Sequence, residues 1–282
     1  MSRLLFTAIF ALGILTAERP YVTADLFCQL GNQMFQIAAA TALALDHDAD
    51  ALFPALREQE RYGMPKNREW VFFRLDDSPL PSKPRKIYRE QRHNFSPIPF
   101  VPNLKVHGYF QSEKYFRSQR EAILSLFQPH PELIAKVEQA YGDILAHPCS
   151  VAIHVRTYNA EDPSHDTFFE AKRSYLEAAV RLFPKEALFI VCSDDIPWCK
   201  QNLQGLAKNM RFIEGGEYLT DFWLISSCRH QIITSSTFSW WAAYLNPNPE
   251  KIVVAPRRWL RPRLNKDDRG IIPEGWVVLD NG

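Results

Sequence analysis

Residues 231–245, which read QIITSSTFSWWAAYL, join an apolar run to a second apolar run through a series of hydroxyl side chains. The first four residues predict a β-strand, and the part that begins at Phe238 predicts a helix. Ser235, Ser236 and Thr237 lie where this helix begins, and hydroxyl residues are favoured helix N-caps. The N–H groups and the positive dipole end of such a helix also suit phosphate. Capping explains one hydroxyl better than three, so both interpretations stay open at this point.

The same alternation continues through the C-terminal half of the chain. Short apolar runs predict further strands, and the segments between them carry apolar residues at helical spacing. This pattern predicts a parallel sheet that is covered on both faces and binds ligands at the carboxyl ends of its strands. In chain order we expect strand 151–155, helix 168–183, strand 187–192, helix 196–206, strand 210–213, helix 219–228, strand 231–234, helix 238–245 and strand 252–255.

The N-terminal half is less regular. Many of the 20 prolines fall within residues 54–104, which predicts long loops there. The expected elements are strands at 21–27, 51–53 and 106–110 and helices at 33–45, 113–127 and 131–146. With a boundary at Pro148, the sequence predicts an α/β protein of two Rossmann-like lobes, residues 21–147 and 148–282, with a cleft between them.

Composition restricts the classes of partner. The chain has 282 residues, 46% of them hydrophobic, and a formal net charge of +1. This near-neutral balance provides no general field for nucleic acid or an anionic membrane, so we expect no nucleic-acid partner. The five cysteines are odd in number and have no zinc-finger spacing, which favours buried reduced thiols.

The first 20 residues form an apolar extension that we set apart from the fold. Met1-Ser2-Arg3 precedes an apolar run over 4–17, a pattern typical of a signal peptide or a marginal membrane anchor. The run is short for a membrane span, and a buried or disordered extension is an equal alternative. From this segment we expect peripheral membrane association and otherwise a cytoplasmic location.

Arg156 and His154 stand at the end of the expected strand 151–155. The planar guanidinium of an arginine can bind phosphate oxygens in pairs, although a surface salt bridge is the plainer interpretation. His154 alternates with apolar neighbours, and taken alone it reads as a half-buried structural histidine.

Acidic residues follow the same pattern at other strand and helix ends. Asp194 and Asp195 follow strand 187–192, where they can contact a ribose or a base edge, or cap the next helix. Asp221 lies in the first turn of its helix, where an acid is also electrostatically favourable. Gly31 permits a tight turn and a close backbone approach. Neither a Gly-x-Gly-x-x-Gly fingerprint nor a P-loop is present, so dehydrogenase and P-loop nucleotidase classes are not supported.

Five segments together resemble the alpha-1,2-fucosyltransferase family, glycosyltransferase family 11. Two come from the N-terminal half, GNQMFQIA at 31–38 and HGYFQSEKYF at 107–116. Three come from the C-terminal half, IHVR at 153–156, SDD at 193–195, and the long stretch 221–246. They occur in the family's order, and the resemblance covers residues 21–260.

The resemblance implies a GT-B-like fold and an inverting transfer of L-fucose from GDP-fucose to the 2-hydroxyl of a galactose-containing glycan. It implies no metal and no cofactor, since GDP-fucose is a co-substrate. The first lobe would lie on the acceptor side, and residues 148–282 would bind GDP-fucose.

The resemblance also implies roles for single residues. Arg156 matches the arginine that holds the donor phosphates, and it is our candidate catalytic residue. His154 and Asp221 match positions that hold guanine in related enzymes. The hydroxyls of Ser235, Ser236 and Thr237 match a turn on the diphosphate, and Gly31 and Asn32 match a loop that closes over the donor. We add Asp194 as a candidate contact to the nucleotide.

The chain departs from the family pattern at two places. The family usually has His-x-Arg-Arg-Gly-Asp, whereas Thr157 here replaces the second arginine and Tyr158-Asn159 replace Gly-Asp. Cys28-Gln29 stand where the family usually has two glycines. Two alternatives stay open: a fucosyltransferase of another linkage, such as a protein O-fucosyltransferase, which differs in its acceptor, and an inactive GDP-sugar-binding relative, which the lost arginine suggests. A general base is not evident, since the loop acids Glu161, Asp162 and Asp166 and His165 do not differ from ordinary solvated residues.

Overall fold

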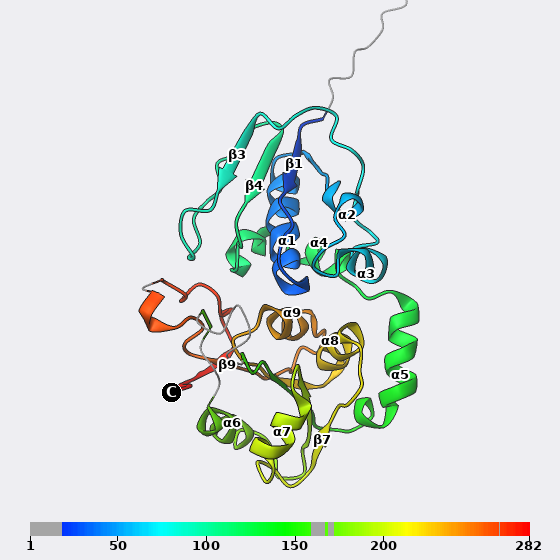
Figure 1. The fold of residues 1–282 in the computed structure, drawn as a ribbon, viewed down its shortest axis with the longest axis vertical. Helices are drawn as coiled ribbons and strands as arrows, with labels where there is room; N and C mark the ends of the chain where they lie inside the picture. Colours follow the sequence, from blue (N-terminus) through cyan, green and yellow to red (C-terminus); the bar gives the residue numbers. More distant parts are fainter. Residues whose placement is uncertain (1–18, 159–166, 169–171, 265) are drawn as a thin grey trace, which may run out of the picture.

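The computed structural model describes residues 19–158, 167–168, 172–264 and 266–282. Figure 1 shows two α/β lobes stacked along the long axis of the molecule, with helices α1 and α9 facing each other where the lobes meet. Each lobe is built on its own parallel sheet.

The first lobe contains a four-stranded sheet in the order β2-β1-β4-β3, with all neighbours parallel. Its alternate apolar residues, such as Val22 and Val106, pack against the Ala-rich helix α1. The strands are β1 (Tyr21–Ala24), β2 (Asp50–Ala51), β3 (Lys86–Arg89) and β4 (Leu104–His107), and the helices are α1 (Leu30–Asp46), α2 (Ala55–Glu58), α3 (Met64–Trp70), α4 (Arg120–Leu126) and α5 (Pro131–Leu145), with 3-10 turns at Glu113–Tyr115 and Arg117–Gln119.

The second lobe contains a six-stranded parallel sheet in the order β10-β9-β8-β5-β6-β7. The strands are β5 (Ser150–Val155), β6 (Leu188–Ser193), β7 (Met210–Phe212), β8 (His230–Ile232), β9 (Val253–Pro256) and β10 (Val277–Leu279). The helices are α6 (Arg173–Val180), α7 (Ile196–Leu203), α8 (Tyr218–Ser227) and α9 (Thr237–Leu245), with a 3-10 turn at Pro262–Leu264.

Helices cover both faces of this second sheet, as the sequence predicted. Val151 and Ile153 of β5 share a core with α6 and α7, whereas Ala152 belongs to the core that contains α8 and α9. Because successive side chains of a strand point to opposite faces, the two helix pairs lie on opposite sides of the sheet. Figure 1 shows α8 and α9 on the side toward the first lobe and α6 and α7 on the far side.

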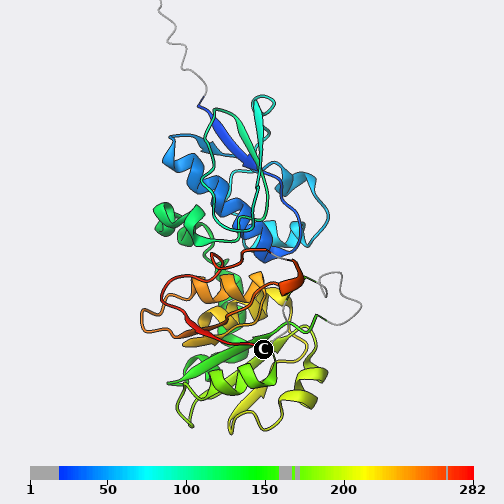
Figure 2. The same cartoon turned by 90° about the vertical axis from the view of Figure 1, so that its left-hand side faces the viewer.

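An aromatic core joins the two lobes on one side of the molecule. The ring of Phe35 in α1 lies 4.5 Å from that of Trp240 and 5.1 Å from that of Trp241 in α9, and Phe116 stacks on Trp241 at 5.3 Å. Both tryptophans are fully buried, so they act as packing residues. Figure 2, turned by 90°, again shows α1 lying across α9.

The first lobe differs in detail from the expectation. Residues 54–104 contain the helix α3 and the edge strand β3, although the prolines predicted only loops. Helix α5, which we had placed in the first lobe, packs against α8 of the second lobe. The residue at which one lobe gives way to the other stays a prediction.

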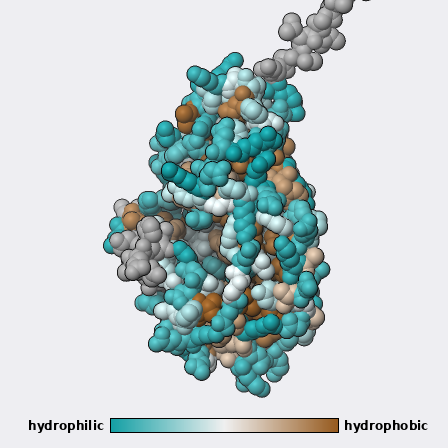
Figure 3. All heavy atoms as spheres, turned by 45° about the vertical axis from the view of Figure 1, so that its right-hand side comes forward, coloured by the Kyte–Doolittle hydropathy of each residue, from teal (hydrophilic) through white to brown (hydrophobic). Residues whose placement is uncertain are grey.

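The expectation of a membrane association is corrected here. Among the described residues no helix combines the length and apolar character needed to cross a bilayer. The apolar run at 4–17, which carried that expectation, lies outside the described residues. In the view of Figure 3, hydrophilic residues dominate the surfaces of both lobes, with hydrophobic residues visible between them at the waist.

Candidate active site

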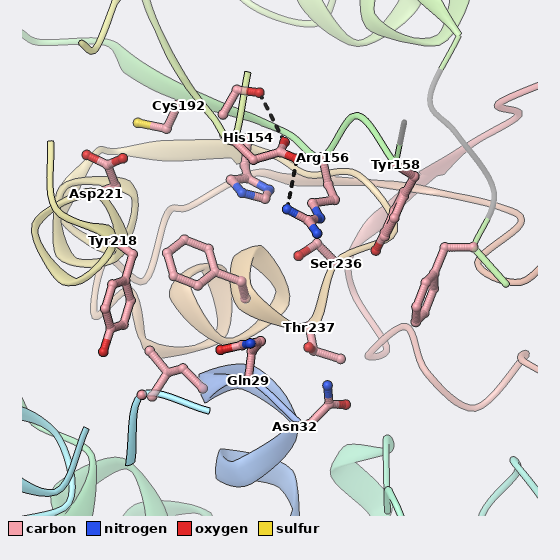
Figure 4. A pocket seen from close by; sticks show the side chains of 17 residues that line it. Gln29, Asn32, His154, Arg156, Tyr158, Cys192, Tyr218, Asp221, Ser236 and Thr237 are labelled. Atoms are coloured by element: carbon pink, nitrogen blue, oxygen red, sulfur yellow. Dashed lines mark hydrogen bonds and ion pairs between the residues drawn. The ribbon is translucent and has the colours of Figure 1, made fainter. Parts of the chain in front are cut away.

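A cleft of about 400 Å³ lies between the lobes. From the first lobe it is lined by Gln29, Leu30, Gly31, Asn32 and Gly63, and from the second by His154, Arg156, Tyr158, Phe168, Cys192, Ser193, Asp194, Tyr218, Asp221, Ser236, Thr237 and Phe238. Every predicted site residue except Ser235 lines this one cleft. In Figure 4, Asp221 and Tyr218 lie at one end, Arg156 and Tyr158 at the other, and His154 between them.

Three helices begin at this cleft. Helices α1, α8 and α9 start at Leu30, Tyr218 and Thr237, and their N-cap side chains accept no hydrogen bond from the helix. These starts direct main-chain N–H groups and the positive ends of three dipoles toward the same space. The cleft is therefore suited to a strongly anionic group.

Arg156 follows β5 directly at the edge of the sheet. Its Nη1 donates to Asp194 Oδ2 at 2.8 Å, and its main-chain N–H donates to Thr234 Oγ1 at 3.1 Å. Its guanidinium lies 5.3 Å from the ring centre of Tyr158, and its side chain keeps 34% of its exposure. The salt bridge and the phosphate role are thus compatible, because the carboxylate holds the guanidinium at the cleft while part of it stays exposed.

The two acids after β6 have separate tasks. Asp195 caps α7 by accepting from the N–H of Trp198 at 2.9 Å. Asp194 instead holds Arg156, and it accepts from both the main-chain N–H and the hydroxyl of Thr157 at 3.1 Å each. Thr157, which replaces the family's second arginine, thus helps to position the carboxylate that orients Arg156. The structure places Asp194 in the cleft as a partner of the arginine.

The other end of the cleft is apolar and contains two buried polar atoms with no partner. Neither His154 Nδ1 nor Asp221 Oδ1 has a hydrogen bond within the described part of the chain. Burial lowers the pKa of His154 to about 4 and raises the pKa of Asp221 to about 6. The ring of Phe238 lies 5.3 Å from that of His154. Because unsatisfied buried polar atoms are costly, their presence here indicates a site for a polar ligand.

The three hydroxyls before α9 do not act as one group. Ser236 and Thr237 line the cleft, but Ser235 is fully buried and donates to the carbonyl of Arg258 at 3.3 Å. The carbonyl of Ser235 accepts from the hydroxyl of Tyr158 at 2.6 Å. In this structure the side chain of Ser235 is a packing element behind the site, so we carry only the other two hydroxyls forward.

Of the two reasons considered for Gly31, a tight turn and a close backbone approach, the structure shows the second. Gly31 lies in the first turn of α1, and a Cβ added there would come within 2.5 Å of the carbonyl carbon of Thr237. Its lack of a side chain therefore permits the starts of α1 and α9 to approach each other. Asn32 is oriented by Gln111, whose amide donates to its Oδ1 at 2.7 Å.

Sequence reasoning missed four aromatic residues of the cleft, Tyr158, Phe168, Tyr218 and Phe238. Tyr158, at φ 46°, stacks on Phe168 with ring centres 5.1 Å apart. Tyr218 donates to Asn67 of α3 at 2.7 Å and so links the lobes beside the cleft. Tyr218 could have been found, since it precedes Asp221 by three residues and helical spacing places both on one face.

Two further expectations concern a bound metal ion and a general base. Within the described ranges no group of three or more His, Cys, Asp or Glu side chains is placed to hold a metal ion. Independence from metal remains a prediction, because it needs a measurement on the active protein. The loop residues considered as a base, Glu161, Asp162, His165 and Asp166, lie outside the described residues.

Comparison with known proteins identifies the class and then the family. The chain superposes on a crystal structure of the alpha-1,6-fucosyltransferase NodZ of Bradyrhizobium, soaked with GDP-fucose, with a TM-score of 0.53. The match covers 82% of this chain and 94% of that chain at 14% identity, and it confirms the GT-B-like fold of a glycosyltransferase. The model of Glycosyl transferase family 11 matches residues 3–280, and the chain belongs to this family.

Relatives in this family agree with the resemblance. An alpha-1,2-colitosyltransferase of Escherichia coli is 28% identical over 92% of this chain and 99% of its own length. The galactoside alpha-(1,2)-fucosyltransferase 2 of Oryctolagus cuniculus is 27% identical over 79% of this chain and 66% of its own length. The chain is therefore a family 11 glycosyltransferase whose relatives form α-1,2 linkages.

Proposed function

We propose that this protein transfers L-fucose from GDP-fucose to the 2-hydroxyl of a galactoside, with inversion at the anomeric carbon and without a metal ion. The observation that carries the proposal is the convergence of Arg156 and three helix starts on one cleft. A nucleotide diphosphate needs such a concentration of positive charge and N–H donors. The names of the family relatives support the sugar and the linkage.

The two ends of the cleft fit the two ends of GDP. Guanine presents adjacent N–H donors, and the buried carboxylate of Asp221 with His154 beside it supplies acceptors that lack partners in the described residues. The diphosphate then lies beside Arg156 and the main-chain N–H groups at the start of α9, where Figure 4 shows Ser236 and Thr237. Burial in an apolar pocket strengthens these hydrogen bonds.

Charge development gives this arrangement a catalytic role. As the bond between the anomeric carbon and the β-phosphate oxygen breaks, the sugar acquires oxocarbenium character and the diphosphate gains negative charge. Arg156 and the three helix starts stabilise that charge where it forms, which lowers the barrier. The acceptor hydroxyl attacks the opposite face of the anomeric carbon, and the product is inverted.

Binding and turnover together test the proposal. We expect calorimetry to show GDP binding, and GDP-fucose with lactose to release GDP in an acceptor-dependent manner. NMR of the product should show an α-1,2 linkage on galactose. Binding of GDP without any acceptor-dependent release would instead identify an inactive GDP-sugar-binding relative.

A second donor is favoured by one observation. The colitosyltransferase relative matches along nearly its whole length, whereas the mammalian enzyme matches over two thirds of its own. Colitose is fucose without its 3-hydroxyl, so GDP-colitose would leave the nucleotide contacts unchanged. Comparing kcat/KM for the two donors decides between them, since a site that hydrogen-bonds the 3-hydroxyl discriminates strongly against its loss.

A further inference from the structure

A second group of ionisable side chains lies in the first lobe, outside the cleft just described. Asp25 follows β1, and His107 ends the neighbouring strand β4, so the strand register places them side by side. His107 Nδ1 lies 2.9 Å from Asp25 Oδ2, and Lys105 Nζ lies 2.5 Å from Asp25 Oδ1. The pair forms a carboxylate–imidazole dyad at the carboxyl ends of β1 and β4, and Figure 1 shows these strand ends directed toward the second lobe.

The contacts of the dyad fix which nitrogen can accept a proton. Burial favours the neutral form of Asp25, but hydrogen bonds from Lys105 and His107 outweigh it and lower the pKa of the carboxyl group. An ionised carboxylate only accepts, so His107 donates its Nδ1–H and leaves the lone pair on Nε2. Nε2 has no hydrogen bond to any other described residue, and the side chain is 39% exposed. The same arrangement orients the imidazole base of hydrolytic triads.

Aromatic rings lie beside the dyad. Phe27 stacks on His107 with ring centres 5.4 Å apart, and Tyr109 meets Phe27 edge-on at 5.2 Å. Phe27 is half-buried, and Tyr109 is 37% exposed. Exposed aromatic faces offer apolar contact area next to polar groups, which suits the C–H face of a galactose ring.

The two loops that carry these side chains lead directly into the donor cleft. Phe27 precedes Gln29, which lines the cleft, by two residues, and between them Cys28 hydrogen-bonds to Tyr109. His107 precedes Gln111 by four residues, and Gln111 holds the cleft residue Asn32. The dyad therefore stands at the border of the donor site, on the first-lobe side.

A groove of about 550 Å³ continues from the dyad along the outer face of β1. Asp25 and Lys105 form part of its wall, and the proline-rich loops supply the rest through residues such as Pro54, Pro79 and Pro84. The groove provides space for the further sugars of a glycan whose terminal galactose lies at the dyad.

We propose that Asp25 and His107 act as the base of an acceptor subsite in which Phe27 and Tyr109 hold the galactose. This rests on the proposed function. His107 Nε2 removes the proton of the acceptor hydroxyl as its oxygen forms a bond to the anomeric carbon of fucose. The bond from that carbon to the β-phosphate oxygen breaks, and its electron pair leaves with GDP. Asp25 stabilises the imidazolium form of His107 until His107 releases the proton to water.

The charged surroundings of the dyad determine the expected pH profile. Asp25 and Lys105 contact it directly, Arg89 is the register neighbour of His107 on β3, and Glu90 follows that strand. Burial raises the pKa of Glu90, whereas hydrogen bonds from Lys105 and His107 lower the pKa of Asp25. A general base accepts a proton only in its unprotonated form, so acceptor-dependent kcat should rise with pH and then level off.

Three variants test the base. His107→Gln should lower acceptor-dependent kcat by about 100- to 10,000-fold and abolish the rise of kcat with pH. Asp25→Asn, which permits the wrong tautomer, should lower kcat similarly, while GDP affinity stays unchanged in both. His47→Gln is the matched control, because His47 stacks on Phe100 at the far end of α1. Wild-type kcat and an unchanged pH profile in His107→Gln would overturn the proposal.

A binding measurement separates this inference from the proposed function. Saturation-transfer NMR should detect lactose on the wild-type protein, and Phe27→Ala should weaken that signal without changing GDP affinity. If the wild-type protein turns over neither GDP-fucose nor GDP-colitose, the proposed function fails. The lactose-binding measurement alone then decides whether the acceptor subsite exists. Equal lactose binding by wild type and Phe27→Ala would then refute the subsite.

Discussion

The second lobe contributes Arg156 and two helix starts to the cleft, whereas the first lobe contributes the start of α1 and places a carboxylate and an imidazole at the ends of a smaller sheet. In the second lobe, β5 delivers Arg156 and the turn after β8 delivers the start of α9, so regular elements determine the donor site. In the first lobe, Asp25, Phe27 and His107 belong to short loops and strand ends. From this difference we propose that donor binding and acceptor choice are separable, and the predictions for the donor side are given from the largest effect to the smallest.

The largest effect is expected at Arg156. Arg156→Ala should reduce kcat by about 100- to 1000-fold, because the charge on the departing diphosphate loses a main partner. Arg156→Lys should have a kcat between those of the wild-type protein and Arg156→Ala, because lysine keeps the charge but lacks the planar guanidinium group. Rates of GDP release at saturating lactose measure this.

The matched control for that experiment is Arg173→Ala. Arg173 pairs with Glu177 at 2.9 Å on α6, which covers the face of the sheet away from the cleft. We expect unchanged turnover and unchanged GDP affinity. Full turnover by Arg156→Ala would remove the arginine from the mechanism and assign the stabilisation of the diphosphate to the helix starts.

The next largest effect is expected at Asp221, whose ionisation should make the affinity for GDP depend on pH. Its pKa is raised to about 6 by burial, and guanine needs the ionised carboxylate as an acceptor. Below pH 6 a proton must leave Asp221 before GDP binds, so this carboxyl group should increase Kd about tenfold per pH unit as the pH falls and should contribute no pH dependence above pH 6. Isothermal calorimetry between pH 4.5 and 8 measures the slope.

Asp221→Asn separates this carboxyl group from the nucleotide. The β-phosphate of GDP also titrates near neutral pH, and its contribution is the same for both proteins. The variant should therefore lose only the part of the slope that Asp221 causes. Identical slopes in the two proteins would place guanine elsewhere and would break the division of the cleft into a base end and a phosphate end.

These predictions rest on residues that the sequence located well. The apolar runs of the second lobe predicted every strand from β5 to β9 within two residues, because buried parallel strands carry a strong signal. Arg156 and Ser236 were expected to share one cleft because the carboxyl ends of parallel strands meet at one edge. The local sequence was sufficient to predict those strands and helices whose burial follows from their own pattern of apolar residues.

The first lobe shows where local pattern was insufficient. β3 is an exposed edge strand with the sequence KIYR, so it lacks a buried apolar alternation. The dyad of Asp25 and His107 joins residues 82 positions apart through strand register, which no short motif records. Ser235 was assigned with its neighbours, although the direction of its side chain depends on the segment around Arg258. Contacts between distant parts of the chain, which the local sequence does not record, determine the strand β3, the dyad and the direction of the Ser235 side chain.

Gly31→Ala tests the contact between the lobes. The new methyl group would lie 2.5 Å from the main-chain carbon of Thr237, so α1 and α9 would have to separate. Such overpacking costs about 1–3 kcal/mol, and we expect the melting temperature to fall by several degrees. GDP affinity should fall as well, since both helix starts line the donor cleft.

The control is Gly142→Ala in α5. A Cβ there meets nothing within 4 Å, and an alanine in a helix is favoured over glycine by about 0.5–1 kcal/mol. The melting temperature should therefore stay the same or rise slightly. A stable Gly31→Ala protein with normal GDP affinity would show that the two helix starts need not approach each other for donor binding.

The smallest effect is expected at Ser235. Its hydroxyl makes one 3.3 Å hydrogen bond to the carbonyl of Arg258 and does not line the cleft, so Ser235→Ala should cost about 0.5–1.5 kcal/mol of stability and leave the Kd for GDP unchanged. Ser236→Ala removes a hydroxyl that does line the cleft, and it should weaken GDP binding while changing the melting temperature less. Calorimetry and thermal unfolding of both variants measure the two quantities. If Ser235→Ala weakened GDP binding as much as Ser236→Ala, the hydroxyl turn would act as one unit, and the donor site would include the segment behind it.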